Sequence, residues 1–187
     1  MKPLLCLHGY QDNAGTWDTL VPLLPPEISL LAIDFPGHGY SSHFPRGIPY
    51  HVLDFVLAVR RIANTYGWDK ISLLGHSYGS VVSLLYSALY PEYVDHYIGI
   101  DAIMPIPYDP NRRLNKHAEC LDQFLQLDSL NPKSKPSYTY EEAVDHLHKS
   151  RSKWASREAC EILSKRGTEK LADGHYCFSR DPRLKVF

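Results

Sequence analysis

The pentapeptide Gly75-His76-Ser77-Tyr78-Gly79 constrains the fold of this chain more than any other feature. The apolar run at 71–74 predicts a strand directly before it, and apolar residues at helical spacing predict a helix from Ser77 until Pro91. A serine on so sharp a strand-to-helix turn has a strained backbone, and the two glycines lack the Cβ atoms that would clash across it. The pattern predicts that the Ser77 hydroxyl is raised into a cleft above a sheet. The alternative is a chance match in a structural turn.

The same alternation of strand and helix runs through the first hundred residues. Short apolar segments at 4–8, 30–35, 71–74 and 97–100 are typical of strands buried on both faces. Apolar residues from Val52 onward follow helical spacing, and Gly67 is a natural end for that helix. With 187 residues, 44% of them hydrophobic, the chain can bury the core of one domain. We therefore expect an α/β fold with a parallel sheet of about four strands, flanked by helices.

A second region begins after the proline-rich segment at 104–110. Residues 1–100 hold 13 of the 41 charged side chains and the later residues hold 28. Helical patterns are expected near 114–125, at 139–147 behind a capping box of Thr139 and Glu142, and at 156–166, followed by a turn at 173–174. We therefore divide the chain into a core at 1–104 and a mainly helical lid at 105–187.

The loop after the first strand carries a second signal. In His8-Gly9-Tyr10 the glycine lets the loop fold close over the serine, so that the backbone N–H of Tyr10 supplies one oxyanion donor. The N–H of Tyr78, at the start of a helix, supplies the other. His8 is interpreted as a hydrogen-bonded structural histidine rather than the catalytic base, because it precedes the serine in the chain.

A third segment follows the second strand, at 34–41. Gly37-x-Gly39 has the start of a dinucleotide-binding loop, but Ser42 stands where a third glycine is required, which argues against a nucleotide site. We interpret the segment as a tight turn in which Asp34 accepts hydrogen bonds.

Together these motifs resemble the α/β-hydrolase superfamily, and more narrowly its serine hydrolase-like (kraken-like) group. The resemblance implies that Ser77 is the nucleophile, that Tyr10 and Tyr78 are oxyanion donors through their backbones, and that the residues from about 105 form a lid. It rests on Leu7-His8-Gly9-Tyr10-Gln11-Asp12-Asn13-Ala14, Asp34-Phe35-Pro36-Gly37-His38-Gly39-Tyr40-Ser41, the pentapeptide at Ser77 and Phe178-Ser179-Arg180-Asp181-Pro182-Arg183-Leu184.

The superfamily presents its acid and its histidine after later strands, in the order Ser, acid, His. Asp101, at the end of the fourth predicted strand, is a candidate acid, with a loop hydrogen-bond acceptor as the alternative. None of the later histidines has the position of a base; these are His96, His117, His146, His148 and His175. We therefore expect this chain to be an incomplete form of a hydrolase that ends before the usual C-terminal core strands.

The predicted function is a serine hydrolase that cleaves an ester or related acyl bond through an acyl-enzyme at Ser77. The alternative is a catalytically inactive, truncated hydrolase that acts as a binding or regulatory fragment. The hydroxyl, a base and an oxyanion hole suffice for this chemistry, so no metal or organic cofactor is expected. Aromatic side chains suggest a small apolar ester or acyl substrate; they are Tyr10, Trp17, Tyr78, Tyr108 and Phe124.

The net charge and the cysteine content limit which binding partners and which cellular compartment are expected. A net charge of -1 gives no basic footprint for nucleic acid, and no segment approaches the length of a membrane span. The four cysteines are widely spaced, which favours reduced thiols in the cytoplasm, with peroxisomal or vesicular association as alternatives. The oligomeric state is left open by the sequence.

Overall fold

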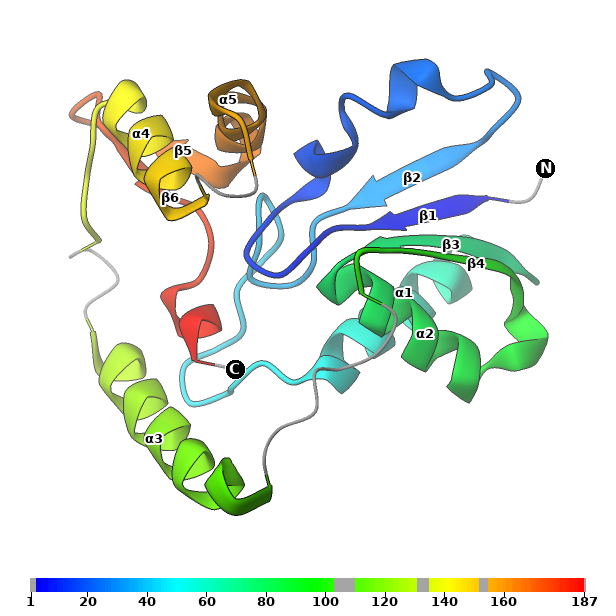
Figure 1. Ribbon diagram of the computed structural model, residues 1–187, viewed down its shortest axis with the longest axis horizontal. Coiled ribbons are helices and arrows are strands. Elements are labelled where there is room, and N and C mark those ends of the chain that lie inside the picture. The colour runs from blue at the N-terminus through cyan, green and yellow to red at the C-terminus, as the bar shows by residue number, and fades with distance from the viewer. Residues whose placement is uncertain (1–2, 103–109, 131–134, 152–154, 187) are drawn as a thin grey trace.

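The computed structural model describes residues 3–102, 110–130, 135–151 and 155–186, with side chains for all of these except 110–115 (Figure 1). Its centre is a parallel four-stranded sheet in the order β2-β1-β3-β4. The strands are β1 (Leu4–Leu7), β2 (Leu30–Ile33), β3 (Ile71–His76) and β4 (Val94–Ile100). The expected parallel sheet of four strands is therefore confirmed, with β3 and β4 longer than the sequence predicted.

The strand register brings the functional loops to one edge of the sheet. Leu7 of β1 lies beside Gly75 of β3, which in turn lies beside Gly99 of β4. Because the strands are parallel, the segments that follow β1, β3 and β4 all leave the sheet at its carboxyl edge. In Figure 1 the arrowheads of β1 and β2 point toward the side of the molecule that holds the later helices α4 and α5.

Side chains alternate between the two faces of the sheet, as the period of a strand requires. Leu5 of β1 and Leu73 of β3 pack on one face with α1 (Val52–Thr65) and α2 (Tyr78–Leu89). Cys6 and Leu74 pack on the other face with Trp17, from the 3-10 turn η1 (Ala14–Trp17). Both faces of the central strands are therefore buried, which explains their continuous apolar runs. Two further 3-10 turns are η2 (Val21–Leu23) and η3 (Pro91–Tyr93).

The later part of the chain is mainly helical, as expected. Its elements are α3 (Pro110–Ser129), α4 (Tyr140–Arg151), α5 (Arg157–Gly167), a hairpin of β5 (Thr168–Lys170) with β6 (Tyr176–Phe178), and the 3-10 turn η5 (Pro182–Lys185). The proline-rich boundary falls largely on 103–109, outside the described residues. No helix in the described ranges is both long enough and apolar enough to cross a membrane.

Local signals set the ends of these helices. The backbone N–H of Glu142 donates to the Thr139 hydroxyl (3.2 Å) and the Glu142 carboxylate accepts from the Thr139 N–H (2.8 Å), which is the predicted capping box. Ser156 caps α5 by accepting from the N–H of Ala159. Gly174 has a φ of 89° in the predicted turn before β6.

The end of the described chain returns to the first sheet. Leu184 is fully buried in the same cluster as Leu5 and Phe35. Asp181 accepts a hydrogen bond from the Tyr50 hydroxyl (2.9 Å), and its N–H donates to the carbonyl of Gly37 (2.8 Å). Residues 181–184 therefore pack as part of the core that the first hundred residues build.

Candidate active site

Ser77 stands on a strained turn between β3 and α2. Its φ of 49° and ψ of -115° lie in a region that residues with a Cβ rarely adopt. The turn is held because the Ser77 N–H donates to the carbonyl of Ile100 (2.9 Å) and the Ser77 carbonyl accepts from the N–H groups of Ser80 and Val81. Hydrogen bonds with three neighbouring residues therefore hold Ser77 in its strained backbone conformation.

The two glycines of the motif are required by close backbone contacts. A Cβ on Gly75 would lie 2.4 Å from the carbonyl oxygen of Gly79, and one on Gly79 would lie 2.1 Å from the carbonyl oxygen of Leu7. Backbone atoms cannot move aside as a flexible side chain can. The steric argument made from the sequence is confirmed, and it shows that β1 and α2 touch through the motif.

The two predicted oxyanion donors lie in neighbouring segments. Tyr78 is the first residue of α2, and the N–H groups of a first helical turn have no acceptor within the helix. Tyr10 lies in the turn after β1, and its ring centroid is 5.0 Å from that of Tyr78. Gln11, next to Tyr10, has a φ of 61°, so the chain reverses sharply at this point. The structure therefore brings the loop after β1 against the start of α2.

Two buried histidines hold the loop after β1 to the loop after β2. His8 accepts from the N–H of Phe35 at Nε2 (3.0 Å), and its Nδ1 lies 2.7 Å from the carbonyl oxygen of Gly9. His38 accepts from the N–H of Gln11 at Nε2 (3.1 Å), and its Nδ1 lies 3.0 Å from the carbonyl oxygen of Pro36. Since Nε2 accepts in each ring, Nδ1 carries the proton and donates.

Burial keeps both rings neutral. It lowers the pKa of His8 to about 3 and that of His38 to about 4, since a buried imidazolium loses its hydration. Both nitrogens of each ring are already engaged. These histidines position loops, in agreement with the structural interpretation of His8.

Asp34 accepts the hydrogen bonds expected of it. Its Oδ1 accepts from the N–H of Ala14 (2.7 Å) and its Oδ2 from the N–H of Tyr40 (2.9 Å) and from the Arg166 guanidinium (2.8 Å). Burial opposes ionisation, but these donors lower the pKa of the Asp34 carboxyl below its usual value. A Cβ on Gly39 would overlap this carboxylate, so the turn requires a glycine at this position.

An open cleft of about 640 Å³ lies at the carboxyl edge of the sheet. His76, next to Ser77, and Asp101, at the end of β4, both line it. Asp101 directly follows β4 and has a φ of 74°, so the chain turns sharply at this residue. On the opposite side the cleft is bounded by α5, through Ala159 and Leu163. The predicted acid therefore shares a cleft with the neighbour of the predicted nucleophile.

The histidines of the chain are the candidates for the base that would activate Ser77. Among the described residues, no hydrogen bond joins a histidine to the Ser77 hydroxyl. His96 lies 3.1 Å from the carboxylate of Asp95, and His175 lies 3.5 Å from that of Asp173. The rings of Tyr138 and Phe178 contact His146.

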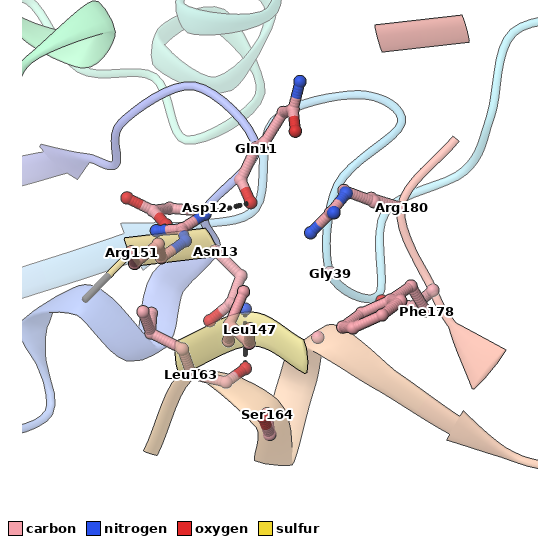
Figure 2. Close-up of a pocket in the computed structure, with 12 residues that line it drawn as sticks. Gln11, Asp12, Asn13, Gly39, Leu147, Arg151, Leu163, Ser164, Phe178 and Arg180 are labelled. Carbon is pink, nitrogen blue, oxygen red and sulfur yellow. Dashed lines mark hydrogen bonds and ion pairs between the residues drawn. The ribbon is translucent and has the colours of Figure 1, made fainter. Parts of the chain in front are cut away.

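The structure adds polar residues that the sequence analysis missed. Asp12 forms an ion pair with Arg151 of α4, which also donates to the carbonyl of Gln11 (3.0 Å). Figure 2 shows this pair beside Gln11, with the guanidinium of Arg180 pointing toward the same loop from the other side. Arg151 lies 139 residues from Asp12 in the sequence, so no local sequence pattern predicts this ion pair.

Comparison with known proteins agrees with this architecture. The family model described as alpha/beta hydrolase fold matches residues 2–157. With its parallel sheet, the strained serine between β3 and α2 and this match, the chain belongs to the α/β-hydrolase fold family.

Curated proteins of known sequence resemble this chain over nearly its whole length. The chain is 37% identical over 187 residues to a probable serine hydrolase of Drosophila melanogaster, covering 99% of this chain and 56% of that protein. It is 38% identical to the human serine hydrolase-like protein 2, covering 97% of this chain and 58% of the relative. The chain thus spans little more than half the length of these curated relatives.

Among solved structures, a hypothetical protein of Pseudomonas aeruginosa superposes with a TM-score of 0.87 at 36% identity, over 99% of this chain and 64% of that one. A thioesterase domain from the curacin biosynthetic pathway superposes with a TM-score of 0.79 at 24% identity, over 99% of this chain and 66% of that one, which shows the shared fold.

Proposed function

We propose that this chain carries the nucleophile and the oxyanion hole of a serine hydrolase that cleaves an ester or related acyl bond. The observation that carries the proposal is the backbone of Ser77, whose φ of 49° is fixed by close contacts of Gly75 and Gly79. A turn under such constraint is expected where a side chain must be presented rigidly to a reacting atom.

In the proposed reaction the base takes the proton of the Ser77 hydroxyl while the Ser77 oxygen attacks the acyl carbon of the substrate. The backbone N–H groups of Tyr10 and Tyr78 stabilise the negative charge that develops on the acyl oxygen. The alcohol leaves with a proton from the base, and water then releases the acid from Ser77. The proposed reaction requires a histidine as the base, and no described residue is assigned to that role. Asp101, which lines the cleft, is the proposed acid.

The surroundings support a small-molecule substrate. The cleft at the carboxyl edge is bounded by the core on one side and by α5 on the other, so the helical part of the region 105–187 acts in this proposal as a lid, whereas residues 181–184 pack with the core. All four cysteines are free thiols, which agrees with a reducing compartment such as the cytoplasm.

A second candidate function is that of an inactive hydrolase homologue that binds a ligand without turnover. It is favoured by one observation: among the described residues, no histidine forms a hydrogen bond with the Ser77 hydroxyl. Slow hydrolysis alone would not separate the two functions, because an oxyanion hole without a triad still accelerates acyl transfer by roughly a thousandfold.

Labelling with a fluorophosphonate separates them, because the probe reports an activated serine. We expect intact-mass analysis to show one adduct per chain, lost completely in Ser77→Ala. Ser87→Ala is the matched control and should label like the wild type, since Ser87 lies farther along α2 and its hydroxyl donates to the carbonyl of Ser83 (2.8 Å). A folded protein without an adduct would contradict the hydrolase proposal and support the binding function.

A further inference from the structure

A basic pocket lies on the lid side of the molecule, where β6, η5 and the segment before α4 meet. Its volume is about 100 Å³. Three cationic side chains line it: Lys135, Arg180 and Lys185. Tyr138, His146 and Phe178 provide its aromatic wall, and Pro136 and Pro182 complete the lining. No Asp or Glu is among these described lining residues, so the positive charges face the pocket without a carboxylate.

Within the described residues, no ion pair is formed by Lys135, Arg180 or Lys185. The neighbouring arginines have partners: Arg183 pairs with Asp181 and Asp128, and Arg151 pairs with Asp12. Among the described residues, no such carboxylate lies within ion-pair distance of Arg180. Its contact is with the ring of Phe178, 4.8 Å from the guanidinium carbon. A guanidinium that is partly buried without a carboxylate destabilises the fold, unless a bound anion provides the missing charge.

The pKa of Arg180 also supports an anion site at this pocket. Burial, followed by repulsion from Arg151, lowers the pKa of its guanidinium. The more distant charge of Asp12 opposes both effects only in part, so the net pKa of Arg180 stays below its ordinary value. A ligand anion in the pocket would relieve both, and its charge would be attracted more strongly here than at a solvated surface.

The walls of the pocket indicate what the anion is attached to. The ring centroids of Tyr138, His146 and Phe178 lie 5.5 to 5.8 Å from one another, with interplanar angles from 30° to 61°, so the three rings form one aromatic cluster in the pocket wall. Such a wall accommodates a flat or apolar body, while Arg180 offers a planar set of N–H donors that fits a carboxylate or a phosphate.

We propose that this pocket binds the acidic group, carboxylate or phosphate, of a small aromatic or apolar molecule. Arg180 lines both this pocket and the depression formed with Gln11 and Asp12, so the anion site adjoins the loop after β1 (Figure 2). The site stands on its own residues and does not require that Ser77 be reactive.

Binding can be measured directly with simple probes. Phenyl phosphate and benzoate are titrated into the 187-residue protein by calorimetry, with benzyl alcohol as the neutral analogue and inorganic phosphate as the anion without a ring. We expect saturable binding of at least one aromatic anion, weaker binding of inorganic phosphate, none of benzyl alcohol, and affinity that falls with added salt. Comparison of the two aromatic anions decides between phosphate and carboxylate.

Variants then test the residues. Arg180→Met should weaken binding of the preferred anion at least tenfold, and Arg180→Lys should lose less because it retains the charge. Lys70→Met is the matched control, because it removes one exposed positive charge directly before β3, at the opposite edge of the sheet, and should bind like the wild type.

Two results would overturn the proposal. One is the absence of binding by every aromatic anion, or equal binding of benzyl alcohol. The other is unchanged affinity in Arg180→Met. Should that variant fail to fold, the Lys135→Met/Lys185→Met double variant takes its place, since Lys185 is exposed and Lys135 is only partly buried. Unchanged affinity in the double variant would equally reject the site. Fluorophosphonate labelling of Ser77 is measured in a separate experiment. Failure of anion binding therefore does not count against the proposed hydrolase function, and failure of labelling does not count against the anion site.

Discussion

At the residue scale, His8 and His38 show how a side chain of catalytic type can serve the architecture instead. Each ring accepts a backbone N–H at Nε2 and faces a backbone carbonyl at Nδ1, so the pair joins the loops after β1 and β2. A histidine held in this way has no nitrogen left to take a proton from Ser77. The interaction also makes the fold sensitive to acid, because protonation of either ring would replace an acceptor with a donor.

This sensitivity gives a prediction with a defined sign. The pKa values of His8 and His38 are lowered in the folded protein, so between pH 6.5 and 4 the unfolded chain binds more protons and stability falls with decreasing pH. Each histidine is expected to contribute about 2 kcal/mol to the stability lost between pH 7 and pH 5, where the unfolded side chain becomes charged.

Urea unfolding of His38→Gln at the two pH values measures its share. The amide oxygen can still accept from Gln11, but the variant should lose about 2 kcal/mol less than the wild type over this interval. Equal acid sensitivity in His38→Gln and the wild type would refute the assignment.

At the scale of elements, the turn from β3 to α2 is the unit that positions Ser77. Two glycines allow three backbone segments to meet: the end of β1, the end of β3 and the first turn of α2. The hydrogen bond from Ser77 to Ile100 adds the end of β4. The position of the hydroxyl is therefore fixed by all three strands, and not by the pentapeptide alone.

Replacement of Gly79 tests this packing. A Cβ there would lie 2.1 Å from the carbonyl oxygen of Leu7, so Gly79→Ala should force β1 and α2 apart and destabilise the protein by about 3 kcal/mol. Gly67→Ala is the control, because Gly67 has a φ of 63° but open space around it, and should cost only about 1 kcal/mol from backbone strain. Denaturant titrations of both variants provide the comparison, and similar losses would argue against tight packing at the turn.

At the scale of the whole molecule, the described parts of the chain share one core. Leu184 is fully buried with the side chains of the first sheet, and Arg166 of α5 pairs with Asp34 after β2. Asn13 donates to the carbonyl of Leu163 in α5 (2.8 Å). The region proposed as a lid is thus attached to the core at several points rather than along one hinge.

Truncation of Leu184 tests whether these parts unfold together. Leu184→Ala should destabilise the protein by about 3 kcal/mol, because it leaves a cavity within the first-sheet cluster. Hydrogen exchange at the amides of β1 and β3 should accelerate by an amount that corresponds to the same loss of stability. Leu121→Ala on α3, where the side chain is 57% exposed, should change stability by less than about 0.5 kcal/mol. Unchanged exchange in β1 and β3 for Leu184→Ala would indicate a separately folded lid.

The sequence determined the features that depend on neighbours in the chain. Apolar runs, the glycines around Ser77, the capping box at Thr139 and the turn at Gly174 each act through residues a few positions apart, so periodicity and backbone freedom reveal them. Tertiary structure alone decided the pairing of Asp12 with Arg151, the burial of Leu184 and the meeting of Lys135, Arg180 and Lys185. These residues are brought together by strand order and by the path of the loops, and the free energy that fixes such contacts comes from packing between distant segments, which no local pattern records.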